Sequence, residues 1–157
     1  MSMFFNVANN NSEIVLREAI ARNAARYGVM SRHISRVSAR SADITNCAKC
    51  AAYADRASMM DVRHANLTGS KNGIQSYNAS VITANETQAN NITNLVADSK
   101  AGSILNAESI DAQNSVNIFS VSAGGQIIAK SGKVTGTTGT IYNIEPNTLS
   151  PNGIIFT

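Results

Sequence analysis

The chain has 157 residues, a mass of 16.6 kDa and a formal net charge of +3, enough for one ordinary domain or for an extended stalk with a small head. It has no Trp and only 5% aromatic residues, which argues against a large globular core and favours thin contacts repeated along a length or between copies. The charge is uneven, because residues 1–63 hold nine Lys and Arg against five acids, whereas residues 64–157 hold four against five.

The first residues, MSMFFNVANNN, have neither the basic nor the apolar segment of a secretory signal. No run approaches the roughly 20 apolar residues that a membrane span needs. We therefore expect a protein made in the cytoplasm without a signal peptide, with no membrane partner, and carried in a virion or another assembled particle.

Residues 1–11 are expected to form an irregular N-terminal arm, and residues 12–100 an α-helical coiled coil or helical hairpin. Alternating steps of four and three residues from Leu16 to Ala65 meet apolar side chains at eleven of fifteen positions. A repeat averaging 3.5 residues is typical of a helix that packs along a partner helix. The same stepping resumes from Ile74 to Ser99, so the second stretch either continues the stalk or folds back on it.

This spacing predicts a homo-oligomeric interface along the helical region. Polar positions on the same seam, such as Asn23, would fix the register between helices. The apolar residues predicted to form the interface are Leu16, Ile20, Tyr27, Met30, Ile34, Val37, Ile44, Val62, Val81, Ile92 and Leu95.

Residues 101–113 are expected to be a connector, as either a short helix or a strand, and residues 114–157 a β-rich element. Short β-branched runs among Gly and Pro predict a hairpin of 116–121 and 126–129 around Gly124 and Gly125, then strands at 133–134, 140–144 and 154–156. The expected fold class is thus α+β and elongated, with terminal strands that pair with other copies or with a partner sheet.

A series of arginines in the first helix is a candidate basic partner surface. A solvated surface, an acidic protein partner and nucleic acid all remain open explanations; phosphate contacts would make binding salt-dependent. The residues of this surface are Arg22, Arg26, Arg32, Arg36 and Arg40.

Cys47 and Cys50 form a CxxC pattern, which occurs in redox dithiols and in half-sites for metals. His33 and His64 are each about 20 Å away along a straight helix, so neither completes a zinc site within one chain. We predict no metal bound within one chain. For the cysteines we keep two alternatives: small apolar residues in a helix, or a link between chains through a disulfide or a shared metal.

No nucleophile elbow, phosphate-binding glycine loop or zinc-protease motif occurs in the sequence. The chain is therefore expected to be no enzyme, with no cofactor and no small-molecule substrate. The favoured function is a structural protein that forms a homo-oligomeric component of a larger particle, such as a fibre, neck or minor structural protein of a phage-like virion. The alternatives are an adaptor that binds nucleic acid or an acidic partner, and an intracellular polymer.

Overall fold

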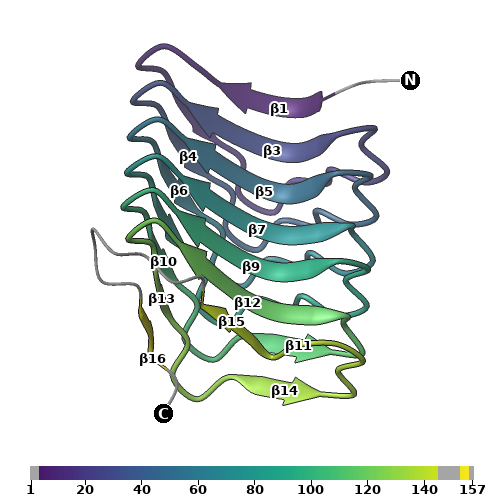
Figure 1. Ribbon diagram of the computed structural model, residues 1–157. Helices are drawn as coiled ribbons and strands as arrows, with labels where there is room; N and C mark the ends of the chain where they lie inside the picture. Colours follow the sequence, from purple (N-terminus) through teal and green to yellow (C-terminus); the bar gives the residue numbers. More distant parts are fainter. Residues whose placement is uncertain (1–3, 145–152, 156–157) are drawn as a thin grey trace.

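The computed structural model describes residues 4–144 and 153–155, and every helix or strand element in this part of the chain is a β-strand. The chain winds into a parallel β-solenoid of about six turns, with each turn stacked on the one before (Figure 1). The predicted α+β fold, with a coiled coil or helical hairpin over 12–100, is therefore wrong. The expected irregular arm also contains the first strand.

One face of the solenoid is a seven-stranded parallel sheet, here called the long-strand sheet because most of its strands have six residues. Its order follows the sequence, so each turn contributes one strand. The strands are β1 (Phe4–Ala8), β3 (Tyr27–Arg32), β5 (Cys50–Asp55), β7 (Asn72–Tyr77), β9 (Leu95–Lys100), β12 (Asn117–Ser122) and β15 (Tyr142–Ile144).

A second seven-stranded parallel sheet, the short-strand sheet, is built from strands of three residues. Its strands are β2 (Glu13–Val15), β4 (Arg36–Ser38), β6 (Met59–Asp61), β8 (Val81–Thr83), β10 (Ile104–Asn106), β13 (Gln126–Ile128) and β16 (Gly153–Ile155). A third face carries single β-bridges and one pair of strands, β11 (Asp111–Gln113) and β14 (Lys133–Thr135).

Equivalent residues of neighbouring turns lie 22 or 23 positions apart, except that 27 residues separate the paired residues of β13 and β16. Tyr27 pairs with Cys50, and Ala52 with Ile74. Each turn is too short for a helix between its strands, so the parallel connections are made by corners alone.

The corners contain residues in the left-handed backbone conformation, and each such corner position recurs once in every turn. Asn tolerates positive φ better than most residues, and Gly adopts it freely. At the corner before the long-strand sheet the sequence supplies only these two types, namely Asn23, Asn46, Gly69, Asn91, Asn114 and Gly136. Asn23 thus sets a corner and does not occupy a layer between helices.

The core is a set of columns, each filled by one residue from every turn. The central residues of the short strands point inward and form one such column, from Ile14 and Val37 through Ile82 to Ile127. A serine column lies beside it: Ser58 donates its N–H to Oγ of Ser80 at 3.2 Å, and Ser80 repeats the contact to Ser103 at 3.3 Å. Small residues with satisfied polar groups keep the solenoid narrow.

The helical prediction failed because the core residues of a solenoid have mixed spacings. Strand residues alternate with a period of two, and every corner resets the alternation, so gaps of two, three and four all occur. In a sequence rich in Ala, apolar residues can then fall at alternating steps of four and three residues although no helix forms. The seam mixes Val37 and Ile44, which are buried in different columns, with Ile20 and Ile34, which are 63% and 68% exposed.

The strands predicted near the C-terminus correspond to β12, β13, β14, β15 and β16, apart from the part of 154–156 that lies outside the described residues. The hairpin was wrong, because β12 and β13 belong to different sheets and both pair in parallel. In the described residues there is no helix long and apolar enough to cross a membrane.

Candidate interaction surfaces

The outer face of the long-strand sheet carries a tyrosine cluster, formed by Tyr27, Tyr53 and Tyr77. Ring centroids are 4.8 Å apart for Tyr27 and Tyr53, and 5.6 Å apart for Tyr53 and Tyr77. Met30 and Cys50 pack with Tyr27 in a second hydrophobic cluster outside the main core. Over β3, β5 and β7 the face is therefore covered largely by its own aromatic side chains, with Tyr53 and Tyr77 half-buried.

Asp98 lies on this face and is only 2% exposed. The phenol of Tyr77 donates a hydrogen bond to Oδ2 of Asp98 at 2.5 Å, and Lys100 Nζ lies 3.4 Å from the same oxygen. Gln75 in turn donates to the Tyr77 oxygen at 2.9 Å. Burial, together with the neighbouring carboxylate, raises the pKa of Tyr77 above its ordinary value, so the phenol stays a donor.

Asp55 is the second buried carboxylate of this face. Asn78 donates to its Oδ1 at 2.6 Å, and Arg32 Nε lies 3.4 Å from its Oδ2. Arg56 approaches the same oxygen at 3.7 Å. The negative charges of both acids on this face are thus balanced by cationic side chains of the same chain.

The outer face of the short-strand sheet is different. The first residue of each strand points outward, and three of them in successive turns form an apolar stripe: Met59, Val81 and Ile104. Met59 is 48% exposed and Ile104 39% exposed. An open groove of about 440 Å³ passes Met59 and Val81 and extends to Glu13 and Arg36. Apolar side chains that remain in solvent in adjacent strands mark a surface able to bind a partner.

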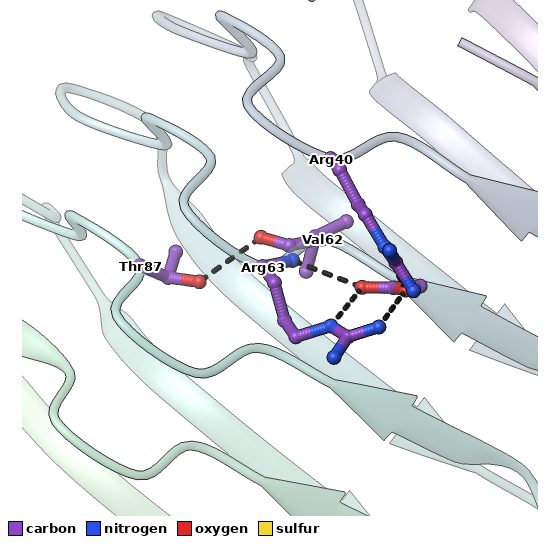
Figure 2. Close-up of polar contacts among 5 residues, drawn as sticks. Arg40, Val62, Arg63 and Thr87 are labelled. Carbon is purple, nitrogen blue, oxygen red and sulfur yellow. Dashed lines mark hydrogen bonds and ion pairs between the residues drawn. The ribbon is translucent and has the colours of Figure 1, made fainter. Parts of the chain in front are cut away.

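Beside this stripe, two arginines from neighbouring turns converge on one carboxylate (Figure 2). Arg63 contacts both oxygens of Asp61, at 3.0 and 2.8 Å, and Arg40 Nε donates to Oδ2 at 2.5 Å. Partial burial raises the pKa of Asp61, but the hydrogen bonds from Arg63 and Arg40 outweigh it and hold that pKa at about 2. Nearby, the hydroxyl of Thr87 donates to the Val62 carbonyl at 3.1 Å, which ties the next turn to the backbone under this cluster.

The predicted basic surface is spread around the solenoid. Arg22 pairs with Asp43 on the third face, whereas Arg32 lies on the long-strand sheet and Arg36 on the short-strand sheet. Arg26 lies at a corner, 5.5 Å from the Tyr27 ring centroid. The structure does not bring the five arginines together.

The 22- or 23-residue register instead forms two other basic columns. One contains Arg17, Arg40 and Arg63, and the other Arg26, Lys49 and Lys71. Sequence reasoning missed the partners in these columns because it followed helical spacing. The 22- or 23-residue spacing would also have found Met59 and Ile104 beside Val81.

The predicted interface residues have equally varied positions. Val81 lies on the apolar stripe, Ile20 and Ile34 are exposed, and Leu16 and Leu95 are half-buried. The others are buried within the single chain: Tyr27, Met30, Val37, Ile44, Val62 and Ile92.

Both cysteines are free and buried, and they lie on opposite sides of the solenoid wall. Cys47 belongs to the main core, and Cys50 to the second cluster with Tyr27 and Met30. Burial raises the pKa of each thiol above its ordinary value, which disfavours the reactive thiolate. A crosslink between chains stays a prediction, and it would require a turn to open.

Among the described residues, no three His, Cys, Asp or Glu side chains gather as a metal site would require. Comparisons with known protein families, with curated proteins and with solved structures give no match to this chain. The inference of function therefore depends on the surfaces described above.

Proposed function

We propose that this chain is a structural protein, a β-solenoid building block that joins copies of itself within a larger assembly. The observation that carries the proposal is the open edge of the first turn. In the described residues, β1 pairs only with β3 and β2 only with β4, so the opposite edge of each strand has no strand beside it (Figure 1).

The side chains of this turn support the same role. Val15 is 59% exposed and Ile20 63% exposed. Ile14 and Leu16 occupy core columns and yet are only half-buried, since the first turn covers them on one side alone. An unpaired parallel edge flanked by apolar side chains is a template for a strand of another chain.

We infer that the assembly is a particle in which rods are useful, such as a fibre, neck or minor component of a phage-like virion. A stack of similar turns gives a stiff rod, and parallel pairing can continue across the junction between copies. The chain would be made in the cytoplasm and incorporated there.

Two edge variants, Ile20→Lys and Val15→Lys, test the proposal. Light scattering and electron microscopy of the unmodified chain should show species longer than one solenoid, and each variant should shorten them, because a charged side chain at an edge disfavours strand pairing. Thr93→Lys, at an exposed corner of an interior turn, is the matched control and should change nothing. Assemblies that survive both edge variants, or an unmodified chain that stays a monomer at all concentrations, would refute the proposal.

A second function is favoured by the basic column of Arg26, Lys49 and Lys71. Three cations in consecutive turns, about 4.8 Å apart, form a positive ridge that a polyanion could follow. A Lys49→Ala, Lys71→Ala variant should lose most salt-sensitive binding to nucleic acid, whereas Lys130→Ala, Lys133→Ala should retain it. Absence of binding by the unmodified chain at low salt excludes this function.

A further inference from the structure

The outer face of the short-strand sheet has a pattern that is complementary to itself. Its central feature is the apolar stripe, which spans about 10 Å across three turns. At the third position of the same strands the side chains are polar: Asp61, Thr83 and Asn106. The face therefore consists of an apolar column and a polar column side by side.

Two copies can place these faces in full overlap with two-fold symmetry in two ways. If the solenoids run parallel, the apolar column of one copy faces the polar column of the other, which buries Asp61 against apolar groups at a high cost. If they run antiparallel, each column faces itself in reverse order. Val81 then faces Val81, and Met59 faces Ile104.

Charge favours the antiparallel arrangement as well. With the axis at Val81, the column two residues beyond the polar column places Arg63 of one copy opposite Glu108 of the other. Arg63 and Arg40 share a single carboxylate, Asp61, so this side of the face keeps a net positive charge that Glu108 can meet. Exposed Lys130 falls opposite Arg40 at the rim, where solvent screens the repulsion.

We propose that this face is an interface with a second copy of the same chain, packed antiparallel about a two-fold axis at Val81. The inference rests on the proposed structural role and names a partner and a surface for it. Six of the seven strands, about 4.8 Å apart and about 10 Å long, offer roughly 290 Å² per copy, which is below the size of a stable interface and suits a weak, transient one. The dimer should therefore depend on protein concentration.

The first test measures mass by sedimentation in the Ile20→Lys background, where stacking through the edge is blocked and the short-strand sheet is intact. A dimer should form with rising concentration, and adding Val81→Lys should weaken it at least tenfold. Gln88→Lys, an exposed change in the same turn on the third face, should leave it unchanged. A dimer insensitive to Val81→Lys, or no dimer at any concentration, overturns the inference.

The second test reads the register with cysteine variants and a short bifunctional maleimide. A maleimide is needed because packed sheets stand about 10 Å apart, beyond the reach of a disulfide. Val81→Cys alone should crosslink, and a mixture of Met59→Cys and Ile104→Cys should crosslink where neither does alone. Cys47 and Cys50 are buried, so the unmodified chain is the blank. Crosslinking of Met59→Cys with itself would refute the antiparallel axis.

The two proposals fail separately. Edge variants that leave long assemblies intact refute the end-to-end building block but leave the face dimer standing. Face variants that leave the dimer intact refute the dimer alone.

Discussion

The outer faces of the two sheets share one register and yet expose their side chains differently. On the long-strand sheet, Tyr27 is 6% exposed and Asp98 2% exposed, whereas Met59 on the short-strand sheet is 48% exposed. Strand length explains the difference. A six-residue strand offers enough outward positions for side chains of adjacent turns to cover one another, and a three-residue strand does not. The outer face of the long-strand sheet (the wide face) is therefore covered by side chains of its own chain. The outer face of the short-strand sheet (the narrow face) leaves apolar atoms exposed to a partner.

The largest effect should come from Tyr53→Ala, which opens the closed face. Tyr53 contacts both other tyrosines of the cluster, and loss of a packed aromatic ring costs about 2–4 kcal/mol of unfolding free energy. Urea unfolding measures the change. A loss below 1 kcal/mol would mean that the face is less closed than its burial indicates.

Tyr77→Phe should cost about 1.5–3 kcal/mol, because a nearly buried carboxylate loses the phenol that donates to it. A cycle with Asp98→Asn tests the cause by urea unfolding. The double variant should be less destabilised than the sum of the single variants, since the two residues share one interaction. Strict additivity would contradict a coupled pair.

Asp61 provides the corresponding test on the narrow face. Its pKa is held at about 2, below the ordinary value of 3.8, so it contributes stability that is complete above pH 4 and is lost as the pH falls from about 4 to about 2. Asp61→Asn should flatten this part of the stability curve, measured by urea unfolding at each pH. An unchanged slope would show that Arg40 and Arg63 do not hold the carboxylate in solution.

Met59→Ala should have the smallest effect on the single chain, below about 0.5 kcal/mol, because the side chain is half in solvent. Measured at low protein concentration, where the chain is monomeric, it contrasts directly with Tyr53→Ala. A loss comparable to that of Tyr53→Ala would abolish the distinction between the faces.

The sequence indicated some strands but not their arrangement. Gly and β-branched residues predicted β12 to β15, because local turn chemistry decides where short strands end. The N-terminal half was misinterpreted because Ala, the best helix former, is also the residue that fits a narrow solenoid core. The 22- or 23-residue repeat was present in Ser35, Ser58 and Ser80, and in the Asn and Gly of one corner.

The candidate surfaces were harder to predict than the strands. Arg40 and Arg63 meet at Asp61 only because 23 residues make one turn, and helical spacing places them far apart. Val81 was predicted at an interface from helical spacing, and the chain has no helix there. Met59 and Ile104 become its neighbours only once the register of the solenoid is known.

The fixed register also makes the length of the molecule adjustable in whole steps. Each interior turn closes a loop of 22 or 23 residues, so the entropy cost of adding such a turn does not grow with the rod. Duplicating one interior turn would lengthen the solenoid by about 4.8 Å and leave every other contact in place. Such a chain can serve as a ruler, whose span in an assembly is set by counting repeats in its gene.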